Sequence, residues 1–254
     1  MSQTILYDGT FSGFLTAVFE VYEYKWANPI IKPAMQFETE LFFEAHQVVT
    51  DTVKSKRVAR ALKNLLGPSG FHKLYCAFLS EIPTIENTLI NGIRYAFSAE
   101  TNIIYDYSNE DVLQISKIAR KVGREKHRME AFVRFQETKD HIYFANIEPD
   151  FNVLPLIKNH FESRYADQKW IIYDLKRSYG LFYNLEYTQS IHLEFDKNLS
   201  TTDAKSEWFS EEEMRHQVLW KDYFKSTNIE ERINTTLHIK HVPKRYWKYL
   251  TEKQ

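Results

Sequence analysis

The sequence predicts an α+β protein, with a helix-rich N-terminal half followed by a mainly antiparallel sheet with packed helices. Two observations favour this class. In the first half, apolar residues recur every three or four positions, which is typical of helices with one buried face. In the second half, short runs alternate apolar and polar side chains, which is typical of half-buried strands. Helices and strands that are segregated along a chain indicate the α+β class.

The first predicted elements are a strand and a helix. Gln3–Tyr7 is expected to be a short strand that ends at the Asp8-Gly9 turn. The apolar spacing then predicts a helix over Phe11–Tyr22. Either Thr10 or Ser12 can cap this helix, because both side chains carry an oxygen that accepts from a free backbone N–H.

A basic helix is expected after an extended segment. Leu41–Val49 is predicted to be extended and half-buried. Thr50 or Asp51 then caps a helix over Val53–Leu66, which ends at Gly67-Pro68 because proline cannot continue the hydrogen-bond ladder.

Three more helices follow in the first half. The spacing predicts two of them over Gly70–Ser80 and Thr84–Ser98. After a loop, Ser108 or Asn109 caps a long helix over Val112–His127.

The alternation then changes to that of strands. Ala131–Phe135 and Ile142–Ile147 are predicted as a hairpin that is joined by the loop Glu137–His141. A helix is expected over Val153–Tyr165, with Asn152 as its cap, since this choice places a proline in the first turn.

The remaining elements are expected to be three strands and one helix. The strands are Trp170–Leu175, Leu181–Leu185 and Tyr187–Phe195. A polar loop over Leu199–Glu207 precedes a helix over Ser210–Phe224, which opens with a capping box. We expect one domain over residues 1–254, with a seam that would separate a helical lobe, 1–108, from an α/β lobe, 109–254.

Composition excludes several classes of protein. The 33 Lys and Arg residues nearly balance the 34 Asp and Glu residues, so a charged footprint must come from local clusters. The single Cys76 excludes an internal disulfide framework and any multi-cysteine metal site in this chain. No apolar run reaches the ~20 residues that span a bilayer, and the N-terminus lacks the pattern of a signal peptide. A cytoplasmic protein without membrane contact is therefore expected.

The most basic segment lies at the end of the long predicted helix. Arg120, Arg124 and Arg128 recur every four residues, which places three guanidinium groups on one helical face. Guanidinium groups bind phosphate oxygens in bidentate fashion, so this face is a candidate nucleic-acid site. The alternative is a solvated face whose charges are paired with Glu125 and Glu130. Both interpretations stay open.

A second basic helical face contains Lys56, Arg60 and Lys63. By itself a face of this kind is more often a solvated surface than a binding site.

The C-terminal segment HVPKRYWKYL is a third basic candidate. A short helix is expected to begin at Pro243. Lys244 and Arg245 would contact phosphates, and Tyr246 or Trp247 would stack on a base, as single-stranded nucleic-acid surfaces require. In the alternative interpretation, Trp247 docks into the core and the basic side chains remain in water.

Four residues are candidates for chemistry: His127, Asp150, His160 and Asp174. Carboxylates and histidines carry out general acid–base work and metal-assisted hydrolysis. Their spacing matches no metal-binding or catalytic motif, and neither a dinucleotide-binding glycine motif nor a P-loop is found. Ion pairing is therefore the favoured role for the carboxylates, and we predict no metal site and no cofactor.

Five segments together resemble a known family. They are YDGTFSGFLTAVFEVY, TDTVKSKRVARAL, REKHRMEAFVRF, IEPDFNVLPLIKNHFESRYADQKWIIYDLKRSYG and HVPKRYWKYL, and they span the chain in order. The chain resembles a bacterial family of unknown biochemical function that is described as acting in DNA metabolism. Members are typically encoded beside a radical SAM protein assigned to DNA modification or repair, and some carry an extra uracil-DNA glycosylase-like domain. We expect this chain to lack that domain, and it lacks the cysteines that a radical SAM cluster needs.

The resemblance and the basic clusters together lead to a functional expectation. The chain is expected to be a DNA-binding accessory protein in DNA repair or modification, with DNA and a radical SAM enzyme as its partners. Two alternatives stay open. One is a nuclease- or glycosylase-like enzyme, and the other is a protein-interaction scaffold that does not contact nucleic acid. Whether the chain is an enzyme at all is left open by the sequence.

Overall fold

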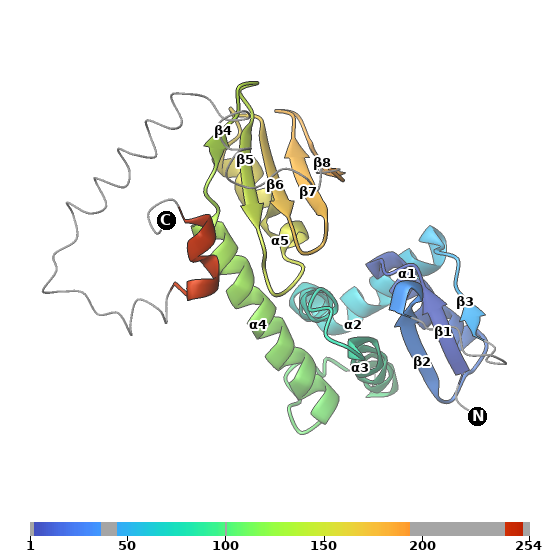
Figure 1. Cartoon of the computed structure of the whole chain (residues 1–254). Coiled ribbons are helices and arrows are strands. Elements are labelled where there is room, and N and C mark those ends of the chain that lie inside the picture. The colour runs from blue at the N-terminus through green and yellow to red at the C-terminus, as the bar shows by residue number, and fades with distance from the viewer. Residues whose placement is uncertain (1–2, 37–44, 100, 194–241, 251–254) are drawn as a thin grey trace, which may run out of the picture. The chain divides into compact units, whose positions relative to one another are not determined.

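The computed structural model describes residues 3–36, 45–99, 101–193 and 242–250, and the chain divides into two units, Met1–Arg124 and Glu125–Gln254. The elements are labelled in Figure 1. The α+β class is confirmed, since helices fill most of the first half and a mixed, mostly antiparallel five-stranded sheet lies in the second. The single domain with a seam near Ser108 stays a prediction.

The first unit contains a small parallel sheet that the sequence did not predict. Its strands are β1 (Gln3–Tyr7), β2 (Pro29–Pro33) and β3 (His46–Gln47), in the order β2-β1-β3. Strand β2 was missed because a proline stands at each of its ends, and proline normally argues against a strand. β1 pairs in parallel with both neighbours, so this part of the chain has α/β character.

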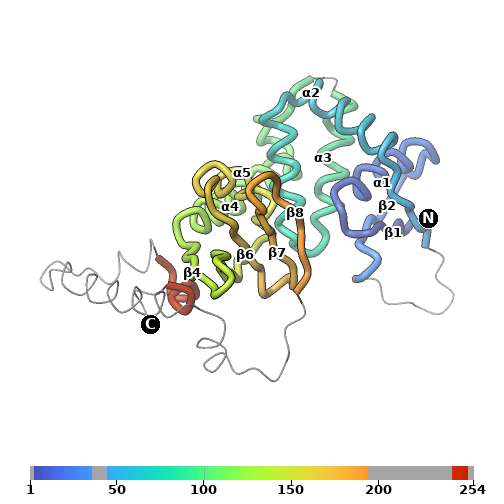
Figure 2. The backbone as a smooth tube through the Cα atoms, turned by 90° about the horizontal axis from the view of Figure 1, so that it is seen from above, coloured from blue at the N-terminus to red at the C-terminus, as the bar shows by residue number. Residues whose placement is uncertain are grey.

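The helix between β1 and β2 begins and ends close to its prediction. It is α1 (Phe11–Glu23), and its cap is Thr10, whose Oγ1 accepts a 2.9 Å hydrogen bond from the N–H of Gly13. Phe14 and Val18 from this helix are almost completely buried, as is Ile5 from β1. Figure 2 shows α1 close to β1 and β2. The helix thus covers the sheet with its apolar face.

The second helix contains the predicted break. α2 (Thr52–Phe78) is capped by Asp51, which accepts hydrogen bonds from the N–H groups of Val53 and Lys54. At Gly67 the backbone leaves the helical region, with φ 70° and ψ 172°. This confirms the predicted stop, because such a conformation is open essentially only to glycine.

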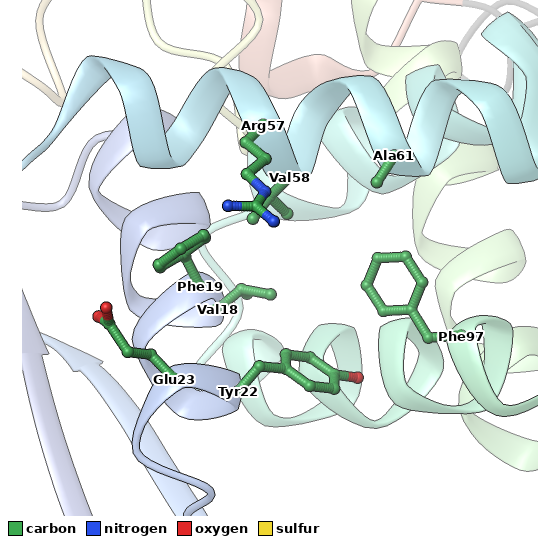
Figure 3. Close-up of a pocket in the computed structure, with 8 residues that line it drawn as sticks. All are labelled: Val18, Phe19, Tyr22, Glu23, Arg57, Val58, Ala61 and Phe97. Carbon is green, nitrogen blue, oxygen red and sulfur yellow. The ribbon is translucent and has the colours of Figure 1, made fainter.

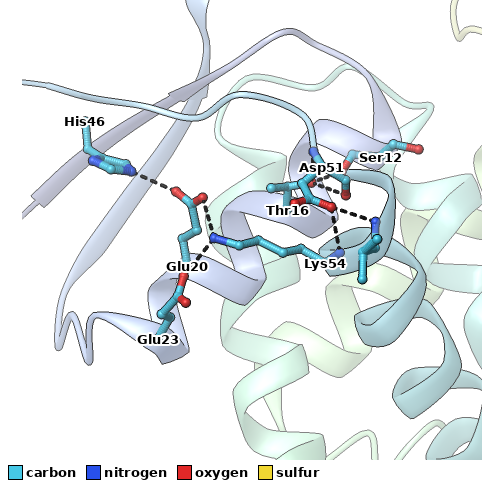
Figure 4. Close-up of polar contacts among 8 residues, drawn as sticks. Ser12, Thr16, Glu20, Glu23, His46, Asp51 and Lys54 are labelled. Atoms are coloured by element: carbon cyan, nitrogen blue, oxygen red, sulfur yellow. Dashed lines mark hydrogen bonds and ion pairs between the residues drawn. The ribbon is translucent and has the colours of Figure 1, made fainter.

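A polar cluster joins α1, the start of α2 and β3 (Figure 4). The Glu20 carboxylate accepts a 3.0 Å hydrogen bond from Lys54 Nζ and lies 2.7 Å from His46 Nε2. Lys54 also reaches Glu23, with an Nζ to Oε2 distance of 2.8 Å. The cluster satisfies the nearly buried Glu20, so its role is structural.

Two further helices complete the helical half. They are α3 (Ile85–Ala99) and α4 (Glu110–Phe132), and the predicted cap Asn109 accepts a hydrogen bond from the N–H of Val112. The predicted strand Ala131–Phe135 is wrong, because α4 continues to Phe132 and the strand β4 is limited to Gln136–Glu137. A short apolar run fits the periodicity of a helix as well as that of a strand. Here the burial of Met129 favours the helix.

The second unit is built on a five-stranded sheet with one helix packed on it. The elements after α4 are β4 (Gln136–Glu137), β5 (Tyr143–Ile147), α5 (Leu154–Arg164), β6 (Trp170–Asp174), β7 (Tyr179–Tyr183), β8 (Thr188–Ile191) and the 3-10 helix η3 (Lys244–Tyr249). The strand order is β4-β5-β6-β7-β8, and only β5 and β6 pair in parallel. Figure 1 shows α5 against one face of this sheet.

Aromatic side chains form the core between α5 and the sheet. Phe161 of α5 contacts the Trp170 ring of β6, with ring centroids 6.1 Å apart, and both side chains are buried. Trp170 also stacks on Tyr183 of β7. At Gly180 a Cβ atom would lie 2.8 Å from the carbonyl oxygen of Ile172, so glycine is required there.

The predicted cap of α5 is wrong. The residue at the cap position is Val153, which makes no side-chain cap bond, although the expected proline is in the first turn. Asn152 instead accepts a 2.5 Å hydrogen bond from the Tyr179 hydroxyl. The Asn152 side chain, which was expected to cap the helix, is therefore bonded to a residue that is distant in the sequence.

Some predictions lie outside the described residues. These are the loop Leu199–Glu207, the helix Ser210–Phe224 and most of the extended segment Leu41–Val49. Among the helices that the structure describes, none has the length and apolar character needed to cross a membrane.

Candidate nucleic-acid interface

Four cations form an exposed face on α4, which we call the basic stripe: Lys117, Arg120, Lys121 and Arg124, all in the first unit. At ~100° per residue they fall within about 100° of helical arc. The opposite face is buried in the core through residues such as Ile115, Ile118 and Val122. Burial of the apolar face is what turns the cations toward solvent.

The acidic partners that the sequence offered to this stripe are engaged elsewhere. Glu130 lies 2.7 Å from Lys126, measured from Oε1 to Nζ. Glu125 is buried and belongs to a cluster in the second unit. Within the described ranges, no hydrogen bond or ion pair is found for Arg120 or Arg124. Arg120 and Arg124 therefore lie on the exposed face without the acidic partners that were considered for them, whereas Arg128 has one in Glu125.

The third predicted arginine of this helix differs from the other two. Arg128 belongs to the second unit, and its Nη1 lies 3.6 Å from Oε2 of Glu125. Its side chain is about one-third exposed, so only part of it is available to a ligand.

Two predicted contact residues at the C-terminal end, Tyr246 and Arg245, are bonded to carboxylates. Tyr246 of η3 is 2% exposed and donates a 2.5 Å hydrogen bond to Oε1 of Glu125. Arg245 places Nη2 at 2.9 Å from Oε2 of Glu125 and Nη1 at 2.5 Å from Oδ2 of Asp150. A ring that is so buried has no face free for a base, so we leave Tyr246 out of the proposed interface.

Burial and hydrogen bonds shift the pKa values of Tyr246 and Arg245 in this cluster. Burial raises the pKa of the Tyr246 hydroxyl, and the hydrogen bond to Glu125 raises it further. Burial by itself would lower the pKa of Arg245, but the hydrogen bond with Tyr246 and the charge of Glu125 raise it. Arg245 is therefore held by two carboxylates, Glu125 and Asp150, while 40% of its side chain is exposed.

The other C-terminal candidates are more accessible. Lys244 is exposed, and its Nζ lies 5.9 Å from the Trp247 ring centroid. Trp247 is half-buried and donates a 3.0 Å hydrogen bond to the carbonyl of Val242. Lys248 is paired with Glu148. Lys244 is thus an exposed cation of η3 for which the described residues show no ion pair.

Asp150 and Asp174 are brought together as partners of one arginine. Asp174 is buried and lies 2.8 Å from Nη1 of Arg177, and its Oδ1 accepts from the N–H groups of Lys176 and Arg177. Arg177 Nη2 also donates to the carbonyl oxygen of Asp150 at 3.1 Å. Burial raises the pKa of Asp174, and Arg177 opposes this shift. These contacts connect the chain at Asp150 with the turn after Asp174 through Arg177. They do not place the two carboxyl groups as an acid–base pair.

The two histidine candidates do not join these carboxylates. His127 is highly exposed, and its Nδ1 lies 3.9 Å from Glu130. Nδ1 of His160 lies 3.8 Å from the same carboxylate. In the part of the chain that the structure describes, no three metal-ligating side chains come together. The two histidine candidates thus lie beside Glu130, whereas Asp150 and Asp174 are joined through Arg177.

The first unit contains a pocket that was not predicted from the sequence (Figure 3). Its volume is about 360 Å³, and it is lined by Val18, Phe19, Tyr22, Glu23, Arg57, Val58, Ala61 and Phe97. The Arg57 guanidinium lies 5.6 Å from the Phe19 ring centroid, and Glu23 is held by Lys54. The lining is mainly apolar, so the pocket offers contact area rather than a nucleophile.

The fold and the site define a mixed α/β protein that presents a cationic helix to solvent. The chain belongs to a family that is described only as a domain of unknown function, DUF4130, whose model matches residues 83–252. A search of the curated proteins found no match. The matched region contains the basic stripe and η3, whereas the second basic face on α2 lies outside it.

Proposed function

We propose that the protein binds nucleic acid through the basic stripe of α4. The observation that carries this proposal is that Arg120 and Arg124 are exposed on one helical face and pair with no carboxylate among the described residues. Guanidinium groups without an internal partner are free to bind phosphate oxygens in bidentate fashion. The lysines of the stripe add charge for which no particular base sequence is needed.

The family resemblance described above supports a particular biological process for this binding. It supports a DNA-binding accessory protein that acts in DNA repair or modification beside a radical SAM enzyme. No three metal-ligating side chains come together among the described residues, which supports the accessory role over a metal-dependent nuclease. The apolar pocket is the feature that suits the other alternative, a protein-interaction scaffold.

The test is fluorescence anisotropy of labelled single-stranded and duplex DNA across a salt series. We expect binding that weakens steeply with salt, since each neutralised phosphate contributes about −0.9 to the logarithmic slope for duplex DNA. The variant Lys117→Gln/Lys121→Gln/Arg124→Gln should bind more weakly and show a shallower slope.

A matched control removes the same charges from the other basic face. Lys56→Gln/Arg60→Gln/Lys63→Gln also replaces two lysines and one arginine, at exposed positions of α2. We expect it to bind like the wild type. Equal losses in the two variants would show a general effect of net charge and would contradict the assignment to α4. No binding at low salt would overturn the proposal as a whole.

The partner is tested separately. The full chain should co-purify with a radical SAM protein of the kind encoded beside members of the resembled family, when the two are expressed together. Separate elution of the two proteins in size-exclusion chromatography would contradict the partnership and leave the proposal on nucleic acid intact.

A further inference from the structure

The loop between α3 and α4 exposes two tyrosines. Tyr105 is 68% exposed and Tyr107 is 42% exposed, whereas the preceding Ile103 and Ile104 are buried. The isoleucines anchor the loop in the first unit. The tyrosine rings contribute little to that core, and large exposed aromatic groups on a surface often mark a binding site.

Hydrogen bonds hold this loop in a defined shape. The Tyr95 hydroxyl of α3 donates a 2.5 Å hydrogen bond to Oδ2 of Asp106. Oδ1 of Asp106 accepts from the N–H and the hydroxyl of Ser108. The only carboxylate between the two tyrosines is therefore occupied within the loop, so it opposes an anionic ligand less than a free carboxylate would.

Cations lie beside both exposed rings. Nζ of Lys73 is 4.5 Å from the Tyr105 ring centroid. The Tyr107 hydroxyl is 3.5 Å from Oγ of Ser116, which stands one helical turn before Arg120 of the basic stripe. The bond with Ser116, followed by the charges of Lys73 and Arg120, lowers the pKa of Tyr107 against the effect of desolvation. Tyr107 thus lies near Arg120 of the stripe, and Lys73 lies beside Tyr105.

We propose that Tyr105 and Tyr107 are a base-stacking platform beside the basic stripe and that the nucleic acid bound there is single-stranded. This inference rests on the proposed function and deepens it. In a duplex the faces of the bases are already stacked on one another, whereas a single strand can place its bases on aromatic rings. Cations beside exposed rings are the combination that such a strand requires, charge for the backbone and rings for the bases.

The test compares two pairs of substitutions in anisotropy measurements with labelled oligothymidylate of about 16 nucleotides and with a duplex. Tyr105→Leu/Tyr107→Leu removes both rings, and Tyr105→Phe/Tyr107→Phe keeps them. We expect the leucine variant to bind the single strand at least about five-fold more weakly, by the usual strength of stacking on one ring. The phenylalanine variant should bind like the wild type, and duplex binding should not change.

A control pair tests whether any loss of exposed tyrosine has this effect. Tyr24 and Tyr187 are 53% and 55% exposed, and Tyr24→Leu/Tyr187→Leu should leave single-strand binding unchanged. Unchanged single-strand binding by Tyr105→Leu/Tyr107→Leu, or tighter binding of wild type to the duplex, would overturn the platform but not the stripe. Absence of wild-type binding to both probes would overturn the proposed function and this inference together.

Discussion

The Tyr246 hydroxyl donates a 2.5 Å hydrogen bond to Oε1 of Glu125, a residue 121 positions earlier in the chain. The same oxygen accepts from the N–H of Asp150, and the other carboxylate oxygen accepts from Arg245. One buried carboxylate of the second unit therefore holds η3 and the loop at Asp150 to the end of α4. Figure 1 shows η3 beside that part of α4.

Removal of this carboxylate should destabilise the protein strongly. Glu125→Ala would leave the Tyr246 hydroxyl and the Asp150 N–H without their acceptor, and Arg245 would keep only Asp150 as a carboxylate partner among the described residues. Unpaired buried groups of this kind cost about 3 kcal/mol in the free energy of unfolding. Urea unfolding followed by circular dichroism measures this loss. The exposed Glu186→Ala is the control, and an equal effect of the two substitutions would show that the cluster does not stabilise the fold.

The buried pair Tyr7 and Glu86 should make stability depend on pH. Oε1 of Glu86 accepts a 2.8 Å hydrogen bond from the Tyr7 hydroxyl, and burial raises the pKa of Glu86 above its ordinary 4.5, against the lowering effect of that bond. At pH values between 4.5 and the raised pKa, Glu86 holds a proton in the folded state that it has lost in the unfolded chain. The contribution of Glu86 to stability is therefore full below 4.5 and is lost as the pH rises through the folded pKa.

Glu86→Gln should remove this dependence while keeping an acceptor for Tyr7. The free energy of unfolding of the wild type, relative to this variant, should fall as the pH rises through the window. Thermal melts over the acidic to neutral range measure it. Tyr7→Phe removes a bond that lowers the pKa of Glu86, so it should extend the window to higher pH. Parallel pH profiles for the wild type and Glu86→Gln would contradict the assignment.

Substitution of Asp174 should change the stability of the protein far more than substitution of His127. Asp174→Ala removes the charge partner of the largely buried Arg177, and we expect a loss of about 3 kcal/mol in the free energy of unfolding. His127→Ala changes an exposed side chain and should alter stability by less than about 0.5 kcal/mol. Chemical denaturation of both variants checks this. A neutral Asp174→Ala would show that its ion pair is not structural.

Replacement of two glycines, each by alanine, should change the free energy of unfolding in opposite directions. Gly67 has φ 70° and ψ 172°, so Gly67→Ala should cost about 1–3 kcal/mol in backbone strain. Gly123 lies inside α4 and has open space where a Cβ atom would stand. Gly123→Ala should stabilise the helix by about 0.5–1 kcal/mol. Differential scanning calorimetry would record both shifts, and a stabilised Gly67→Ala would contradict the break in α2.

The sequence by itself determined the helices and most of the strands. Thr10, Asp51 and Asn109 cap the helices for which they were candidates, and the break at Gly67 was also expected. The spacing of Arg120, Arg124 and Arg128 also predicted one basic face on this helix, and the first two of these arginines belong to the basic stripe. These features depend on residues three or four positions apart, so the chain carries them locally.

Only the tertiary structure decided which polar groups are free to bind a ligand. Arg124 and Arg245 were equal candidates in the sequence, yet Arg245 is paired with Glu125 and Asp150, far from it along the chain. Asn152 was likewise taken from its helix by Tyr179. Such pairings arise when folding brings distant segments together and burial makes an unpaired charge too costly. The spacing of residues along the chain does not encode these pairings. It could therefore identify the cationic residues but not which of them remain available to bind a partner.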